Sequence, residues 1–285
     1  MLRTVNLDSR GLTQIPAEAL SRPDIESLSL YQNALATLPE TLWQLSKLTV
    51  LNLADNQLTA IPDGIAKLAS LRMLDLGHNR LTSLPDEIGL LSKLSDFLYL
   101  SHNLLSVLPE SLGNLTKLAY LNVSDNILTQ LHASIGNMSA LTELRLYRNQ
   151  LVALPDSICA LRQLRELHVQ QNALALLPPD FGQLTTLREL DLEDNRLTAL
   201  PASIGELSQL RRLNLRNNAI TELPESIGAL DQLTHLDLRA NPIKTLPNEL
   251  GEIPTLEKLD LRWCRLEPLP TWVETLRARG VVVFT

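Results

Sequence analysis

Two aspartates and two histidines recur at equivalent places in the chain and could together bind a metal ion. Asp55, His78, His102 and Asp125 follow one another at steps of 23 or 24 residues, each directly before an asparagine. Strands that lie side by side are about 4.8 Å apart, which would bring these side chains within reach of one Zn²⁺ or a similar ion. The simpler interpretation is that Asp and His are ordinary residues before the asparagine. We therefore expect no metal and no cofactor.

Other arrangements of catalytic residues are missing from the sequence. It contains no Walker phosphate-binding loop, protein-kinase signature, G-x-S-x-G elbow or H-E-x-x-H zinc motif. The two cysteines, Cys159 and Cys264, stand at positions of the repeat described next and are poor candidates for a nucleophile. We predict that the chain is not an enzyme.

The asparagines belong to a repeat that fills the chain, seen most clearly in LNLADNQLTAIPDGIAKLASLRML, residues 51–74. We number repeat positions from this asparagine, position 0. It recurs every 23 residues, with one step of 24, and Arg10 and Cys264 take its place one period outside the run. It stands at Asn33, Asn56, Asn79, Asn103, Asn126, Asn149, Asn172, Asn195, Asn218 and Asn241. The chain thus has about twelve repeats, which is typical of a solenoid.

Each repeat predicts a strand followed by a helical return. Leucines at −5 and −3 place one face of a short strand in the core, whereas the spacing of three after position +5 suits a helical or 3₁₀ segment that starts at the proline at +6. The fold class is therefore an α/β solenoid: a right-handed horseshoe with a parallel β-sheet on the concave face and short helical or 3₁₀ segments on the convex face. The asparagine amide points inward and satisfies backbone groups at the bend.

We expect one domain over residues 1–285, with distinct ends. Residues 1–25 form an irregular first repeat in which Leu2 joins the apolar pattern, and residues 270–285 form a cap. The cap should contain a helix from Pro270 to Arg279 and a thirteenth strand, Val281–Phe284. In that strand Val282 and Phe284 should hold positions −5 and −3.

The repeat resembles the 23-residue class of leucine-rich repeats, L-x-x-L-x-L-x-x-N-x-L-x-x-L-P-x-x-I-x-x-L, over essentially the whole chain. It is similar to plant intracellular Ras-group repeat proteins, Ras-binding repeat scaffolds, bacterial repeat proteins and the repeat regions of Roco GTPases. It departs from the pattern at His132, which replaces the proline, and at Arg10 and Cys264. The resemblance implies a protein-interaction scaffold, with a small GTPase or a signalling enzyme as the first partner to test, although a fold does not fix a function.

Side chains at −6, −4 and −2 should point away from the core, and they include all four tyrosines of the chain. In a protein with only 4% aromatic residues this placement needs a reason, and aromatic residues dominate the energetics of interfaces. The extra residue in Ser95-Asp96-Phe97 also predicts a bulge before one of these strands. The residues predicted to anchor a partner are Val50, Met73, Phe97, Tyr99, Tyr120 and Tyr147, and Tyr31 is a further predicted partner-binding residue.

Charged residues follow on the same predicted face and should form a polar rim that orients the partner. They are Glu143, Arg145, Glu166, His168, Glu189, Arg212, Arg216, Arg239 and Arg262. We expect most of them to be neutralised locally: the three glutamates by Arg145, Arg165 and Arg188, and the last three arginines by Asp191, Asp237 and Asp260.

The net charge of −7 and the pI of about 5.3 argue against nucleic acid or an anionic membrane as a partner. The sequence shows no signal peptide, no membrane-length apolar run and no cysteine cluster, so we predict a cytoplasmic monomer. A bacterial effector secreted into host cells would fit as well. Two other functions stay open: recognition of a glycan or another small ligand by the aromatic strip, and structural self-assembly.

Overall fold

The structure is a computed structural model that describes residues 3–285. Backbone contacts divide it into two compact units, which meet in sequence between Arg145 and Leu146 and are treated separately below. The expectation of one domain over residues 1–285 stays a prediction. Leu2, which we assigned to the first repeat, lies outside the described residues.

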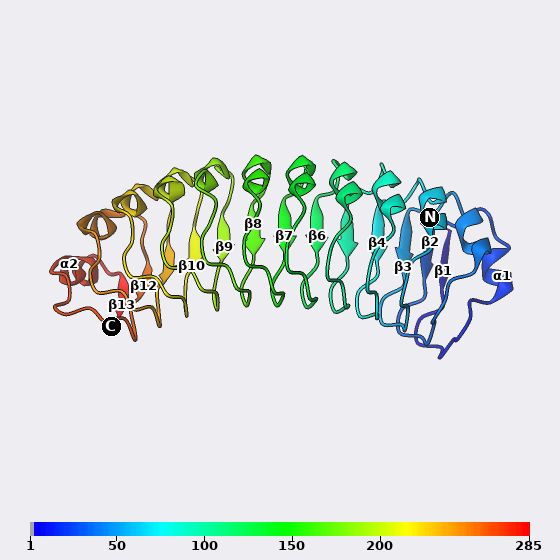
Figure 1. Cartoon of the computed structure of the whole chain (residues 1–285), viewed down its shortest axis with the longest axis horizontal. Helices are drawn as coiled ribbons and strands as arrows, with labels where there is room; N and C mark the ends of the chain where they lie inside the picture. Colours follow the sequence, from blue (N-terminus) through cyan, green and yellow to red (C-terminus); the bar gives the residue numbers. More distant parts are fainter. Residues whose placement is uncertain (1–2) are drawn as a thin grey trace. The chain divides into compact units, whose positions relative to one another are not determined.

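Seven parallel strands, each of three residues, form the sheet of the first unit in sequence order (Figure 1). Equal repeat positions face one another across neighbouring strands, as Val50 faces Met73 and Met73 faces Phe97. The strands are β1 (Thr4–Asn6), β2 (Ser27–Ser29), β3 (Val50–Asn52), β4 (Met73–Asp75), β5 (Phe97–Tyr99), β6 (Tyr120–Asn122) and β7 (Glu143–Arg145).

The sheet of the second unit has six parallel strands in the same order. They are β8 (Glu166–His168), β9 (Glu189–Asp191), β10 (Arg212–Asn214), β11 (His235–Asp237), β12 (Lys258–Asp260) and β13 (Val282–Phe284). In both units the strands occupy repeat positions −6 to −4, so the predicted strand of each repeat is confirmed.

Short 3₁₀ helices form the other wall of each unit, opposite the strands (Figure 1). Nearly all start directly after the repeated proline, whose fixed φ presets the entry into the helix, and this confirms the prediction. The first unit has η1 (Glu40–Gln44), η2 (Asp63–Lys67), η3 (Asp86–Leu90), η4 (Glu110–Asn114) and η5 (Ala133–Asn137). The second unit has η6 (Asp156–Ala160), η7 (Phe181–Gln183), η8 (Ala202–Glu206), η9 (Glu225–Ala229) and η10 (Asn248–Glu252).

His132 replaces the proline before η5 without disturbing the helix. Its backbone is extended, with φ −69° and ψ 146°, as in the prolines of the other repeats. Its imidazole Nδ1 accepts a hydrogen bond of 3.1 Å from the backbone N–H of Ser134. The side chain therefore caps the helix, which offsets the loss of the proline.

The core of each unit lies between the strands and the 3₁₀ helices and consists almost wholly of leucine and isoleucine. In one repeat, Leu51, Leu53, Leu58, Ile65 and Leu68 are fully buried. Burial of one such side chain stabilises the fold by about 1.5–3 kcal/mol. Because every repeat supplies the same apolar positions, the core continues from coil to coil within a unit.

The repeated asparagine connects each coil to the preceding one. The Nδ2 group of Asn56 donates to the carbonyl oxygens of Leu53 (3.0 Å), Ala54 (3.2 Å) and Leu30 of the preceding coil (3.0 Å). Its Oδ1 accepts from the N–H of Leu35 in that coil, at 3.0 Å. The inward amide that we predicted is confirmed. In the last repeat the Cys264 thiol keeps one of these contacts, a donation to the Leu238 carbonyl at 3.3 Å.

The first repeat is irregular, as predicted. A short α-helix, α1 (Ala17–Leu20), replaces the 3₁₀ helix, and Arg10 is exposed at the position of the asparagine. Asn33 of the next repeat still reaches back, and its Oδ1 accepts the N–H groups of Arg10 and Leu12.

The C-terminal cap contains the predicted helix, α2 (Trp272–Ala278), and the predicted strand β13, but the phase that we assigned to β13 was wrong. Val283 pairs with Leu259 at position −5, so Val282 and Phe284 face outward and are 52% and 38% exposed. The reason lies in the turn before the strand, where Val281 is buried and its N–H donates to the Leu276 carbonyl of α2. This contact shifts the alternation of the strand by one residue.

Replacement of a repeat asparagine should destabilise the protein strongly. Asn56→Ala removes four hydrogen bonds and leaves buried backbone groups of two coils without partners, so we expect the free energy of unfolding to fall by about 3 kcal/mol. Urea denaturation followed by circular dichroism measures the change. The matched control is Asn114→Ala at the exposed end of η4, which should change stability by less than about 0.5 kcal/mol. Equal effects of the two substitutions would contradict the stabilising role of the hydrogen bonds made by the repeated asparagines, which we call the asparagine ladder.

Candidate functional site

The four residues considered as metal ligands stand where the backbone turns left-handed. The φ angle lies between 52° and 54° at Asp55, His78, His102 and Asp125. It is also positive at position −1 in all the remaining repeats. Asp, Asn and His tolerate this conformation better than most residues do, which explains their presence here. The left-handed backbone at position −1 was not predicted from the sequence.

These side chains stack and pair rather than surround a common point. The rings of His78 and His102 lie face to face, with centroids 4.0 Å apart, and His102 Nε2 lies 3.5 Å from Asp125 Oδ2. Among residues 3–285, no three of the four ligand candidates place ligand atoms within 4.8 Å of one another. The arrangement fits surface packing better than a coordination sphere.

Position −4 often carries Asn or Asp that closes a turn after its strand. Asp75 Oδ1 accepts the N–H of Gly77 at 2.9 Å, and Asn52 makes the same contact to Ala54. The same turn recurs in the second unit, where Asp191 accepts the N–H of Glu193. Such Asx turns stabilise the exit from a strand, so these polar residues are explained by the fold.

The outward face of the first unit carries the predicted apolar strip. Val50, Met73, Phe97 and Tyr120 are direct neighbours across β3, β4, β5 and β6. Val50, Met73 and Tyr120 are half-buried, whereas Phe97 is 43% exposed. The strip is thus continuous over four strands.

Three aromatic rings gather within this strip and form what we call the aromatic cluster: Phe97, Tyr99 and Tyr120. Their centroids are 5.8 Å apart for Phe97 and Tyr99, 5.5 Å for Phe97 and Tyr120, and 5.1 Å for the two tyrosines. These are the separations at which aromatic rings attract one another. The guanidinium of Arg145 lies 5.7 Å from the centroid of the Tyr120 ring and is held by Glu143, whose Oε1 accepts from Arg145 Nε at 2.5 Å.

The environment of the cluster keeps its phenols protonated. Burial, with Glu143 and Tyr99 adding to it, raises the pKa of Tyr120 to about 12 against the opposing effect of Arg145. Burial and the neighbouring Asp75 also raise the pKa of Tyr99. Asp75 faces Tyr99 across β4 and β5, and burial raises the pKa of its own carboxyl. We did not single out Asp75 from the sequence, although its position −4 would have indicated it.

The extra residue is accommodated immediately before β5, as predicted. The N–H groups of Ser95 and Asp96 both point to the carbonyl of Arg72, and Asp96 pairs with the Arg72 guanidinium at 3.0 Å. Burial would raise the pKa of Asp96, but hydrogen bonds from Ser95 and Arg72 bring it below the usual value. Phe97 then enters the strand in register with Met73.

Tyr31 and Tyr147 take no part in the ring contacts of the aromatic cluster among the described residues. Tyr31 follows β2, is 40% exposed, and donates its backbone N–H to Asp8. Tyr147 belongs to the second unit. Among the predicted partner-binding residues of the first unit, ring contacts therefore join Phe97, Tyr99 and Tyr120 and do not include Tyr31.

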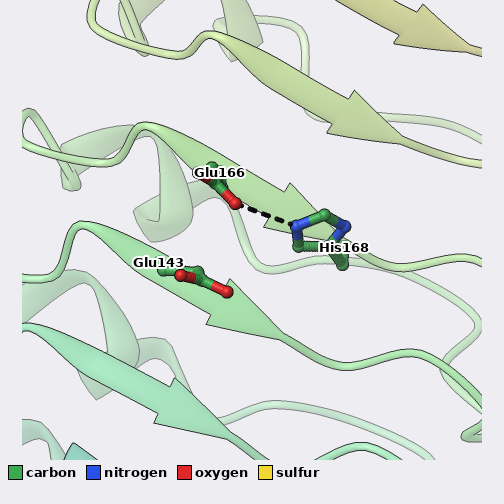
Figure 2. A group of neighbouring side chains, drawn as sticks. All are labelled: Glu143, Glu166 and His168. Carbon is green, nitrogen blue, oxygen red and sulfur yellow. Dashed lines mark hydrogen bonds and ion pairs between the residues drawn. The ribbon is translucent and has the colours of Figure 1, made fainter.

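Charged side chains on the second unit are largely paired with one another. His168 Nε2 lies 3.4 Å from Glu166 Oε2 on β8 (Figure 2), and Arg212 Nη1 lies 4.0 Å from Glu189 Oε2. Two expectations were wrong in detail: these glutamates pair with His168 and Arg212 instead of Arg165 and Arg188. The reason is that side chains at −6 reach positions −4 and −6 of the sheet more readily than position −7 at its edge.

The arginines at position −2 make the shortest ion pairs of this surface. Arg239 pairs with Asp237 and, at 3.4 Å, with Asp260, while Arg262 pairs with Asp260 at 2.7 Å. Burial alone would raise the pKa of the Asp260 carboxyl, but Arg262 and Arg239 hold it below its usual range. Arg216 differs from our prediction, because it pairs with Glu193 at 3.1 Å and not with Asp191. Glu193 and Arg216 both stand at position −2 on adjacent coils, so the Glu193 carboxylate lies nearer to the Arg216 guanidinium than the Asp191 carboxylate does.

A shallow hollow of about 200 Å³ lies over the sheet of the second unit. Acidic residues at −4 (Asp191, Asp237 and Asp260) line it together with residues of both kinds at −6, the acidic Glu189 and the basic or polar Arg212, His235 and Lys258. Lys258 also lies 5.6 Å from the ring centroid of Phe284. The hollow therefore presents both signs of charge.

The cysteines have the surroundings of structural residues. Burial, with Asp180 and Asp156, raises the pKa of the Cys159 thiol, and burial also raises the pKa of the Cys264 thiol. Both stay protonated at neutral pH, and a protonated thiol is a poor nucleophile.

Stacked coils of one strand and one short helix, with an outward sheet face whose side chains vary from coil to coil, define a repeat solenoid. Comparison with known families agrees. The family described as "Leucine-rich repeat region" matches residues 40–123, 66–173, 109–200 and 178–277. The family described as "Leucine rich repeat" matches residues 1–58. The chain belongs to the leucine-rich repeat family.

Solved structures of repeat proteins are similar to the chain. A TDR receptor is 26% identical with a TM-score of 0.82, covering 93% of this chain and 48% of its own. The Arabidopsis receptor kinase HAESA, solved with the peptide hormone IDA and the co-receptor SERK1, is 29% identical with a TM-score of 0.74, covering 92% of this chain and 50% of its own. A leucine-rich repeat protein from Leptospira interrogans is 25% identical with a TM-score of 0.50, covering 100% of this chain and 96% of its own.

The chain spans about half the length of the two receptors. No curated protein matches its sequence. Within residues 3–285, every helix is too short or too polar to cross a lipid bilayer.

The ionisation of Tyr120 should reduce stability at high pH. A tyrosine in the unfolded chain ionises near pH 10, whereas Tyr120 keeps its proton to about pH 12 in the folded state. Its contribution to stability is complete below pH of about 10 and is lost as the pH rises through about 12. Titration of tyrosinate absorbance, native chain minus Tyr120→Phe, should give a difference curve centred near 12. A curve centred near 10 would show that the cluster does not bury the phenol.

Proposed function

We propose that the chain is a non-enzymatic interaction scaffold that binds a folded protein on the outward face of its sheet, with the aromatic cluster as the anchor. The carrying observation is the contact of Phe97, Tyr99 and Tyr120 with one another on an outward face, with Phe97 43% exposed. Clusters of this kind supply most of the binding energy of protein interfaces. Val50 and Met73 extend the anchor along β3 and β4.

The rigidity of the face favours this function. The strands are fixed by the asparagine ladder and by Asx turns, and Arg145 is held beside Tyr120 by Glu143. A preformed surface loses little conformational entropy on binding. Aromatic rings add to this advantage because they have few rotatable bonds.

The charged face of the second unit would orient the partner rather than anchor it. Its ion pairs are mutually satisfied, as for Arg239, Asp260 and Arg262, so they offer little net energy to a partner. Their field can still favour one approach over another. Within this proposal the chain acts in the cytoplasm as a monomer.

The comparisons support binding in general terms. HAESA is a repeat protein solved with a peptide hormone and a co-receptor. The resemblance of the repeat to Ras-group and Ras-binding proteins makes a small GTPase or a signalling enzyme the first partner to test for this chain.

Capture of a partner should depend on the aromatic cluster. We expect the native chain to retain a protein from lysate, identified by mass spectrometry, that Phe97→Asp/Tyr120→Asp loses, because two charges in an apolar contact oppose desolvation. The captured protein is then purified and titrated against both chains. We expect affinity to fall by at least about a hundredfold.

The matched control is Val152→Asp/Leu176→Asp. It introduces the same two charges at side chains that are 62% and 59% exposed and lie away from the strands. Circular dichroism verifies that all three chains are folded. Equal capture by the native chain and the cluster variant would reject the proposed site, and binding of a sugar with a change in tyrosine fluorescence would favour the glycan alternative.

A further inference from the structure

A basic hollow of about 650 Å³ lies at the edge of the first unit where the chain enters its strands. Four cationic side chains from neighbouring coils line it: Lys47, Arg72, Lys93 and Lys117. Glu26 is the single acidic residue in the lining, and Thr49, Ser70 and Ser95 complete it. This concentration of positive charge contrasts with the first unit as a whole, in which acidic residues outnumber basic ones.

The three lysines have no intramolecular ion-pair partner among residues 3–285, whereas several arginines do, including Arg72 with Asp96 and Arg145 with Glu143. All three are exposed. Their charges are therefore available to a ligand, whereas that of Arg72 is already largely balanced.

The fold does not require lysine at these places. Lys47, Lys93 and Lys117 share one repeat position, which in the second unit is occupied by Gln163, Thr186, Gln209, Gln232 and Thr255. A threonine here contributes to the fold: Thr186 Oγ1 donates to carbonyls of the preceding coil, and Thr255 does the same. In three coils of the first unit a lysine replaces this hydrogen bond with a charge, whereas Asp24, Ser70 and Ala140 hold the same position in the other coils.

We propose that this basic hollow is a binding site for an acidic polypeptide segment. Coils are about 4.8 Å apart, so the four cationic residues extend over about 15 Å, the length of an extended segment of about five residues. Lysine is a flexible point charge that suits carboxylates along a chain, whereas a single phosphate is better held by an enclosed site with arginine forks. The Thr49 and Ser95 hydroxyls already donate to the Glu26 carbonyl and to Asp96, so they can only accept from a ligand, whereas the Ser70 hydroxyl can donate to it.

The hollow borders the proposed partner surface without sharing residues with it. Thr49 and Arg72 directly precede Val50 and Met73 in sequence. A partner on the aromatic cluster could therefore place an acidic segment over the lysines. Binding at the hollow does not require the aromatic cluster, because the hollow has its own residues and its own charge.

Binding of a fluorescein-labelled peptide of about eight glutamates, followed by fluorescence anisotropy at low and at physiological salt, tests the proposal. We expect the native chain to bind it in a salt-dependent manner and Lys93→Ala/Lys117→Ala to bind it at least about fivefold more weakly. The matched control Lys67→Ala/Lys244→Ala removes the same charge at exposed sites outside the hollow and should change affinity less than about twofold.

A further variant separates the two proposals. Phe97→Ser/Tyr120→Ser removes the aromatic cluster and should leave binding of the glutamate peptide unchanged. Equal affinity of the lysine variant and its control, or no binding by the native chain, would overturn the inference. It would also be overturned if vesicles containing phosphatidylserine, or inorganic triphosphate, bound through Lys93 and Lys117 while the peptide did not.

Discussion

The hydrogen bonds of one buried asparagine per coil are the interaction on which the rest of the structure depends. Asn56 contacts three carbonyl oxygens and one N–H, and two of these four groups belong to the preceding coil. Buried backbone groups that lack partners are costly, so this single side chain fixes both the bend of its own coil and the stacking on its neighbour. The placement of the strands, the 3₁₀ helices and the leucine core depends on where that bend lies.

Because the backbone is so regular, the positions available for function are few and easy to identify. Position −1 is restricted by its left-handed backbone, as at His78, and position −4 often closes an Asx turn, as at Asp75. Position −6 carries neither duty. There the first unit has Val50, Met73, Phe97 and Tyr120, a composition that the repeat itself does not require and that the proposed binding surface would explain.

Much of the fold could be predicted because the same pattern of residue spacing recurs about twelve times in the sequence. The strands, the 3₁₀ helices after proline and the inward asparagines follow from spacing alone. The phase of β13 could not be predicted, since it depends on the contact between Val281 and α2, which occurs once. Within the candidate site, the apolar strip was predictable from the register, but the ring contacts that unite Phe97, Tyr99 and Tyr120 depend on side-chain torsions. The choice of Glu193 by Arg216 likewise depends on distance in space.

The extra residue at Ser95 and Asp96 shows that a coil can change its length without altering the pairing of the strand that follows. Two N–H groups share the Arg72 carbonyl, Ala119 of the next coil donates to Ser95, and Phe97 still faces Met73. An insertion at this point is therefore neutral to register. A segment that accepts a change in length lets one coil differ from its neighbours while the pairing of the strands is preserved. The edge beside the outward face can then vary in length while the scaffold stays the same.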